Sequence, residues 1–194
     1  MQGLLDAARN GDFESLQKMI STKANLEIKD DAGKTPLMWA VRHGNTECVR
    51  LLIDAKAEIA VINNDGETPL IIAAYYGQTE CTQLLIDAGA DLNVKDKFAR
   101  TALIWAAANG QPECVQRLVD AKAALEVRDN YGETALIWAA DVGHTECVRV
   151  LVKSKANMEA TDNNGKTALT CAAENGNDVC VQLLVCPRGA IQDN

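Results

Sequence analysis

Two short apolar segments alternate with polar, glycine-containing segments along most of the chain, and this pattern predicts pairs of short helices. In the clearest copy, a threonine, a proline and a run of apolar residues are followed by Gly44. Threonine is a good N-cap, proline fits the first helical position and glycine favours the left-handed conformation that ends a helix. We therefore expect one helix from Thr35 to about Arg42. The next apolar segment predicts a second helix from about Thr46 to Ala55.

The polar segment before each expected helix pair has the composition of a tight turn. Residues 30–33 read Asp-x-x-Gly, which suits the tip of a hairpin. Neither helix would be stable alone at about eight to ten residues, so the pairs must bury their apolar sides against one another.

The whole unit returns with a step of 33 residues. The triplet Thr-Pro-Leu at residues 35–37 recurs at 68–70 and, with alanine in place of proline, at 101–103, 134–136 and 167–169. Five cysteines keep the same step: Cys48, Cys81, Cys114, Cys147 and Cys180. A fixed period of this length predicts a solenoid of stacked helix pairs.

The repeated motif resembles the ankyrin repeat. It reads Gly-Lys-Thr-Pro-Leu-Met-Trp-Ala-Val at residues 33–41 and Gly-Asn-Thr-Glu-Cys-Val-Arg-Leu-Leu-Ile at residues 44–53. The resemblance covers essentially the whole chain. It implies an all-α ankyrin-repeat solenoid of six stacked helix pairs with β-hairpin-like loops between repeats. We expect a single domain, 1–194, with repeats at about 1–32, 33–65, 66–98, 99–131, 132–164 and 165–194.

Three departures from the family pattern change local expectations. The family's histidine after Thr-Pro-Leu is replaced, so apolar packing should substitute for its polar link between hairpin and helix, at Met38, Ile71, Ile104, Ile137 and Thr170. The glycine after the second helix is kept at Gly89 and elsewhere becomes lysine, at Lys23, Lys56, Lys122 and Lys155. A left-handed lysine would cost roughly 1–2 kcal/mol. Ala99 stands where the other tips have glycine, which leaves the geometry of that turn open.

The charge and apolar content of the chain exclude two classes of partner. With 27 acidic and 19 basic residues, the formal net charge is -8, which argues against nucleic-acid binding. The longest apolar run, residues 102–108, is too short to span a bilayer, so we expect no membrane insertion. Because the N-terminus has no basic leader or signal-type apolar core, we expect a cytoplasmic, intracellular protein, with the nucleus also open.

The cysteines and histidines favour structural roles over catalysis. Five of the seven cysteines share one repeat position, and stacked helices lie about 8–10 Å apart, too far for most disulfides. Close cysteine pairs typical of zinc sites are absent, so we expect buried thiols and no metal. The only histidines, His43 and His144, are three repeats apart. We therefore expect no enzyme activity and no cofactor.

One helix position holds most of the indole rings. Trp39, Trp105 and Trp138 share it with Ile72 and Cys171. The unbroken apolar occupancy predicts core packing between adjacent repeats, with ligand stacking as the alternative.

The resemblance implies a non-catalytic protein–protein interaction module that binds a partner protein through its concave face of hairpin tips and inner helices. The candidate partner-binding residues there are Arg42, Glu67, Tyr75, Tyr76, Phe98, Arg100, Asn109, Tyr131 and Glu133. Four of the five Phe and Tyr residues fall in this set, and aromatic residues with nearby arginine are typical of binding hot spots. Packing of the rings on neighbouring tips is the alternative.

Other functions compatible with the resemblance are a targeting or scaffold segment of a larger multidomain protein and a stoichiometric inhibitor of an enzyme. The first repeat carries polar residues at Asp6, Ser15 and Lys18, whereas the last helix keeps an internal apolar pattern. We therefore expect a monomer, with stacking through the C-terminal repeat open. The family also implies hydroxylation of Asn93, the one asparagine in an Asp-x-Asn at this repeat position.

Overall fold

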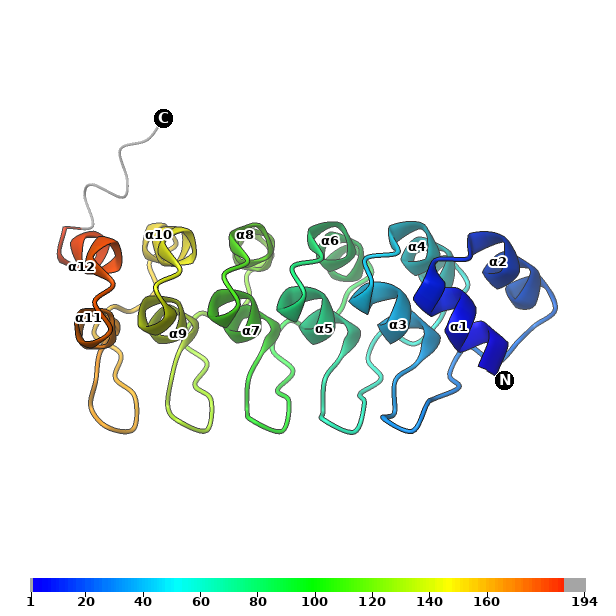
Figure 1. Cartoon of the computed structure of the whole chain (residues 1–194), viewed down its shortest axis with the longest axis horizontal. Coiled ribbons are helices and arrows are strands. Elements are labelled where there is room, and N and C mark those ends of the chain that lie inside the picture. The colour runs from blue at the N-terminus through cyan, green and yellow to red at the C-terminus, as the bar shows by residue number, and fades with distance from the viewer. Residues whose placement is uncertain (1, 187–194) are drawn as a thin grey trace, which may run out of the picture.

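The computed structural model describes residues 2–186, which form twelve α-helices in six consecutive pairs (Figure 1). The inner helices form one row: α1 (Gln2–Asn10), α3 (Pro36–Arg42), α5 (Pro69–Tyr75), α7 (Ala102–Ala108), α9 (Ala135–Val142) and α11 (Ala168–Glu174). The outer helices form the second row: α2 (Phe13–Ser21), α4 (Thr46–Asp54), α6 (Thr79–Asp87), α8 (Pro112–Asp120), α10 (Thr145–Lys153) and α12 (Asp178–Val185). Loops project from the inner row, and this architecture confirms the expected all-α ankyrin solenoid.

The capping residues act as the sequence predicts. The Oγ1 of Thr35 accepts a hydrogen bond from the backbone N–H of Met38 at 3.3 Å, and Pro36 opens α3. Gly44 follows the helix with a φ of 68°, in the left-handed region. The next helix, α4, begins at Thr46 and ends one residue before Ala55, as expected.

The core runs without a break along the stack. Leucines of the inner helices, such as Leu37, Leu70 and Leu103, are 1% exposed, and the five repeated cysteines are buried. All seven thiols are free, and only that of Cys186 is exposed. Burial raises the pKa of the Cys147 thiol to about 12, since an apolar environment disfavours the thiolate.

The loops are tight hairpin-like turns bonded to one another. In the first, the N–H of Asp30 donates to the carbonyl of Lys34 at 3.1 Å. Between residues 2 and 186 no strand forms, apart from an isolated bridge between Thr161 and Thr167. Each tip donates one backbone hydrogen bond back to the preceding tip, at 3.0–3.1 Å, from Asn64, Lys97, Asn130 and Asn163. This ladder holds the tips in a continuous row.

Among residues 2–186, five residues other than glycine adopt the left-handed conformation. The four lysines that replace the family's glycine have φ values between 60° and 71°, at Lys23, Lys56, Lys122 and Lys155. Ala99 has a φ of 62° and its N–H donates to the carbonyl of Asp96 at 2.9 Å. The third tip therefore keeps the turn of its neighbours despite lacking glycine.

The expectation that apolar packing alone replaces the missing histidine is wrong in three repeats. The indole Nε1 of Trp39 donates to Asp30 Oδ2 at 2.9 Å, and the corresponding distances from Trp105 and Trp138 are 2.8 and 3.0 Å. A half-buried indole N–H requires an acceptor, and the tip aspartate supplies it. The polar link between hairpin and helix is therefore retained, but the tryptophan one residue after the histidine position makes it.

Both ends of the described solenoid expose apolar side chains, and the C-terminal end exposes more of them. In the first pair, Lys18 and Phe13 (37%) are exposed on α2. In the last pair, apolar side chains are exposed at Leu169 (37%), Val179 (51%) and Val185 (59%). The equivalent of Leu169 one repeat earlier, Leu136, is 1% exposed because a further helix pair covers it. None of the described helices is long and apolar enough to cross a membrane.

Candidate partner-binding surface

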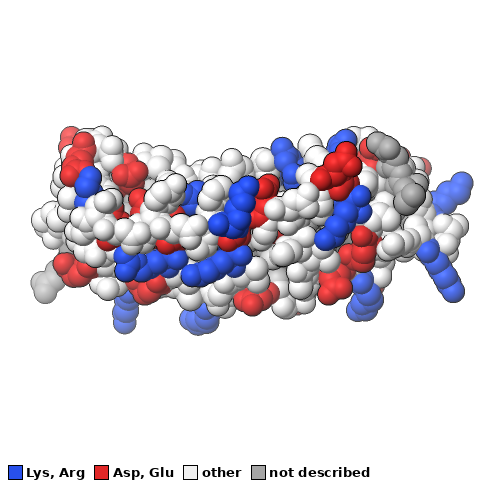
Figure 2. All heavy atoms as spheres, turned by 90° about the horizontal axis from the view of Figure 1, so that it is seen from below, with Lys and Arg blue, Asp and Glu red and all other residues white. Residues whose placement is uncertain are grey.

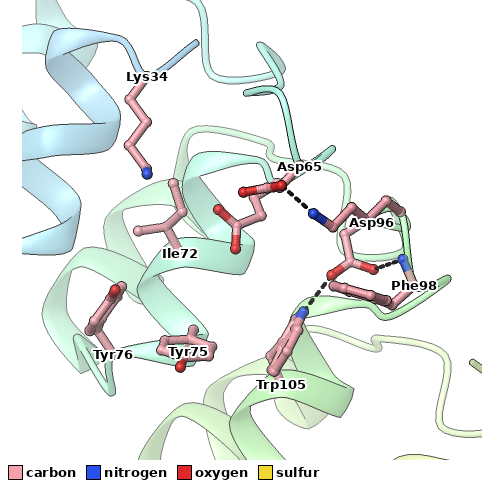
Figure 3. A pocket seen from close by; sticks show the side chains of 10 residues that line it. Lys34, Asp65, Ile72, Tyr75, Tyr76, Asp96, Phe98 and Trp105 are labelled. Atoms are coloured by element: carbon pink, nitrogen blue, oxygen red, sulfur yellow. Dashed lines mark hydrogen bonds and ion pairs between the residues drawn. The ribbon is translucent and has the colours of Figure 1, made fainter. Parts of the chain in front are cut away.

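A cavity of about 270 Å³ opens between the inner helices and the loops at the middle of the solenoid (Figure 3). Side chains of α5 and α7, together with Tyr76 just after α5, form one wall, and residues of the first three tips form the other. Its lining combines aromatic rings with charged groups: Lys34, Asp65, Glu67, Ile72, Tyr75, Tyr76, Asp96, Lys97, Phe98 and Trp105. Four of the residues that the sequence analysis selected, Glu67, Tyr75, Tyr76 and Phe98, thus line one depression.

The rings in this wall pack edge to face. The ring centroids of Tyr75 and Tyr76 are 4.8 Å apart, and those of Tyr75 and Trp105 are 5.1 Å apart. Tyr76 remains 39% exposed and Phe98, on the opposite tip, 41% exposed. Rings held by their neighbours yet open to solvent offer apolar contact area at little entropic cost.

Asp96 holds the loop wall of the cavity in place. Its Oδ1 accepts the N–H of Phe98 at 2.8 Å and the N–H of Arg100 at 2.9 Å, while its Oδ2 accepts the indole N–H of Trp105 (Figure 3). Lys97 forms an ion pair with Asp65 across the mouth. The position of the Phe98 ring is therefore fixed by a turn that is itself tied to α7.

Arg100 is held in place between two indole rings. Its guanidinium carbon lies 4.7 Å from the ring centroid of Trp105 and 4.3 Å from that of Trp138. Its Nε donates to Asp129 Oδ2 at 3.1 Å, and the two side chains are only 12% and 0% exposed. Arg100 therefore joins the third and fourth tips, and only its margin is open to a partner.

The clamp formed by Arg100, Asp129 and the two indole rings depends on a pairing of tip and helix residues that the sequence analysis did not predict. Each tip aspartate that meets a tryptophan lies nine positions before it, as in Asp129 and Trp138. Where the helix has Ile72, the tip has Asn63, whose Nδ2 donates to Glu67 Oε2 at 2.6 Å instead. The joint occurrence of Asp with Trp and of Asn with Ile in the first four tips was the available signal, and the fifth tip departs from it, with Asp162 and Cys171.

Acidic groups gather on the C-terminal side of the cavity. Burial raises the pKa of Glu133 to about 7, and the carboxylates of Asp129, Asp141 and Asp162 add to the effect, whereas Arg100 opposes it. Tyr131, on the same tip, is 59% exposed. Several carboxyl groups therefore lie close together beside an exposed ring.

Basic groups gather on the N-terminal side. The guanidinium of Arg42 lies 4.9 Å from the ring centroid of Tyr76 and 5.5 Å from that of Trp39. His43 stacks on Trp39 with centroids 5.7 Å apart. Burial, then the positive charges of Arg42 and Arg9, lower the pKa of His43. The guanidinium carbon of Arg9, a residue that was not predicted from the sequence, lies 3.9 Å from the ring centroid of Trp39.

The remaining candidates have identifiable structural partners. The Nδ2 of Asn109 donates to the carbonyl of Trp105 at 2.9 Å at the end of α7. Asn93 is exposed, and its Oδ1 accepts the N–H of Ala124 in the next repeat at 2.9 Å. Glu27 and Glu126 accept equivalent backbone bonds in their repeats. Asn93 is thus one of a series of links between adjacent loops.

The loop face shows acidic and basic side chains intermixed over its length (Figure 2). Within residues 2–186, no group of three or more His, Cys, Asp or Glu side chains is placed to hold a metal ion. The chemistry on this surface is therefore that of charged and aromatic contacts.

Comparison with known proteins places this architecture in a family. The profile described as "Ankyrin repeats (3 copies)" matches residues 4–96 and 103–194. The crystal structure of EF0377, an ankyrin repeat protein, is 28% identical with a TM-score of 0.88, covering 94% of this chain and 96% of that one. An ankyrin repeat domain from Acinetobacter baumannii AYE is 31% identical with a TM-score of 0.86, covering 94% and 95%. No curated protein sequence matches significantly. By its profile match over nearly all residues, the chain belongs to the ankyrin repeat family.

Proposed function

We propose that this protein is a non-catalytic module whose concave face binds a segment of a partner protein. Ankyrin repeats are in general non-catalytic modules of protein–protein interaction. The observation that carries the proposal is the central cavity of about 270 Å³, which the exposed rings of Tyr76 and Phe98 both line. Aromatic anchors around a preformed depression are the usual core of a binding hot spot.

The rigidity of this surface supports the proposal. Adjacent tips share backbone hydrogen bonds, such as that from the N–H of Lys97 to the carbonyl of Asp65 at 3.1 Å. Because the groups are ordered before a partner arrives, binding loses little conformational entropy and a few anchors suffice. The free cysteines fit the cytoplasmic location that we propose, since thiols persist in a reducing compartment.

The test compares binding with stability. Proximity labelling or pull-down with the wild-type protein would identify a partner, and titration calorimetry would measure its affinity for Tyr76→Ala and Phe98→Ala. We expect each substitution to weaken binding by roughly 1–2 kcal/mol or more, about tenfold in Kd, with a smaller change in folding stability.

Val179→Ala, which removes an exposed apolar side chain from outer helix α12, is the control and should bind normally. Unchanged binding by both ring variants, or unfolding of both, would show that the rings are structural.

A further inference from the structure

Acidic and basic side chains are intermixed along the concave surface, but the charged groups that lack an ion-pair partner differ between its two ends. At the N-terminal end, three cations surround the Trp39 ring, with Arg9 at 3.9 Å, Arg42 at 5.5 Å and Lys34 at 5.6 Å from its centroid. Arg9 has one carboxylate partner, Asp6, at 3.8 Å. Within the described residues, neither Arg42 nor Lys34 takes part in an ion pair. This end therefore has cationic groups free to meet an anion.

The C-terminal end has the opposite character. Asp141 lies close enough to Glu133 for its charge to help raise the pKa of Glu133, and two cations of neighbouring tips, Arg100 and Lys166, are engaged by other carboxylates. Arg100 pairs with Asp129 at 3.1 Å, and Lys166 pairs with Glu174 at 2.5 Å. Asp141 accepts a neutral amide hydrogen bond from Asn175 at 2.8 Å. Both carboxylates therefore lack a cationic partner of their own among residues 2–186.

The aromatic cavity lies between these two ends, on α5, α7 and their tips. From these three features, we propose that the surface binds an extended peptide segment with acidic side chains at one end, an apolar side chain in the middle and basic side chains at the other. The acidic end would lie over Arg9 and Arg42, and the basic end over Glu133 and Asp141. This inference rests on the proposed function and adds the chemistry and the orientation of the bound segment.

The repeat geometry sets the length of the segment. Trp39 and Trp138 mark the two ends and are 99 residues apart, or three repeats of 33. Stacked helices lie about 8–10 Å apart, so the ends are separated by about 24–30 Å. An extended chain advances about 3.3 Å per residue, so the two charged ends should be about seven to nine residues apart.

The pattern also determines which segments are disfavoured. A uniformly acidic segment would place carboxylates beside Glu133, and a uniformly basic one would place cations beside Arg42. Like charges that face each other across an interface lower affinity, so the charge gradient selects orientation as well as composition.

Selection from a random dodecapeptide library displayed on phage tests this proposal with the full chain as the target. We expect enriched peptides to carry Asp or Glu and Lys or Arg about seven to nine positions apart, with an apolar residue between. Synthetic copies should bind more weakly at high salt, because exposed charge pairs are screened.

Charge-reversed variants identify the two ends. Against Arg9→Glu/Arg42→Glu, the selected peptides should bind at least about tenfold more weakly, and exchanging their acidic residues for lysine should restore binding. Glu133→Lys/Asp141→Lys should do the same for the basic end. Lys34→Glu repeats the first test at a residue that packs less closely on Trp39, in case Arg9→Glu disturbs folding. Lys153→Glu, an exposed reversal on outer helix α10, is the matched control and should change nothing.

The outcomes separate the two proposals. Peptides that lose binding with Tyr76→Ala but show no charge order would overturn the charge inference and leave the concave binding site intact. Peptides that bind independently of Tyr76 and Phe98, or the absence of any enriched peptide, would count against both.

Discussion

The clamp between the third and fourth tips, in which Arg100 lies between two indole rings, depends most on Asp129. Its Oδ1 accepts the N–H groups of Tyr131 at 2.9 Å and Glu133 at 3.0 Å. Its Oδ2 accepts the indole N–H of Trp138 at 3.0 Å and Nε of Arg100 at 3.1 Å. The side chain is completely buried. Asp129→Asn is therefore a small change in shape with a large change in chemistry.

The cost of Asp129→Asn can be worked from these contacts. The asparagine Oδ1 can still accept both backbone N–H groups, but its Nδ2 would face two donors, from Trp138 and Arg100. Loss of a charge-assisted hydrogen bond costs about 1.5–3 kcal/mol, and a buried donor left without an acceptor costs about 1–3 kcal/mol. Because Arg100 keeps some access to water, we expect a total loss of about 3–4 kcal/mol in the free energy of unfolding.

Urea unfolding followed by far-UV circular dichroism measures this loss. Asp65→Asn is the matched control, since Asp65 is on an exposed tip and its partner Lys97 is also exposed, so its effect should be much smaller. The combination Asp129→Asn/Trp138→Ile copies the arrangement of Asn63 and Ile72, with Glu133 in the place of Glu67. It should be about 1–2 kcal/mol more stable than the sum of the single changes predicts. A loss below about 1 kcal/mol for Asp129→Asn, or strict additivity, would refute the pairing argument.

Three further predictions concern the backbone, a carboxyl group and the thiols. Lys56→Gly, Lys122→Gly and Ala99→Gly should each stabilise the protein by about 0.5–1 kcal/mol in urea unfolding, since removing the left-handed strain outweighs the added freedom of the unfolded chain; lower stability of all three would contradict this. The folded-state pKa of Glu133, about 7, exceeds its ordinary value of 4.5, so the folded state binds more protons than the unfolded state between these pH values. The free energy of unfolding should therefore fall as the pH rises from 4.5 to 7. Glu133→Gln should flatten this dependence in unfolding experiments from about pH 5 to 8. Thiol titration without denaturant should show one fast group that Cys186→Ser removes, and several fast groups in that variant would mean the core cysteines are accessible.

The fold could be predicted because each repeat contains the same short motifs. The threonine caps, the glycines after the inner helices and the apolar positions recur at a fixed spacing. A repeat with an atypical residue can therefore be interpreted from the neighbouring repeats. The left-handed turn at Ala99 illustrates this: its sequence is atypical, but the hydrogen bonds that tie its tip to Asp65 and Asn130 hold the turn in the common shape. In such a position, tertiary context outweighs the intrinsic preference of one residue.

The candidate site could be predicted only in part. The sequence placed Tyr76, Phe98 and Tyr131 on the surface correctly, because their repeat positions fall at tips and helix ends. The sequence did not indicate that Arg100 lies between two indole rings, because partner binding already explained the arginine and core packing already explained the tryptophans. Arg9 was missed because the first repeat has no hairpin tip before it. Both errors concern contacts between repeats, which a motif within one repeat does not describe.

The distribution of variation along the repeats explains how one array can be both stable and selective. Positions that hold the stack together are nearly invariant within the chain, whereas the last tip position reads Lys34, Glu67, Arg100, Glu133 and Lys166. Two of these side chains have structural contacts: Glu67 accepts a hydrogen bond from buried Asn63, and Arg100 pairs with Asp129 of the next repeat. These two contribute to stability, whereas the side chains of Lys34, Glu133 and Lys166 make no hydrogen bond to a cap or core residue between positions 2 and 186. The selectivity of the surface therefore depends on groups that the fold does not need, and the charge reversals at Glu133 and Asp141 should alter binding while the helices remain as they are.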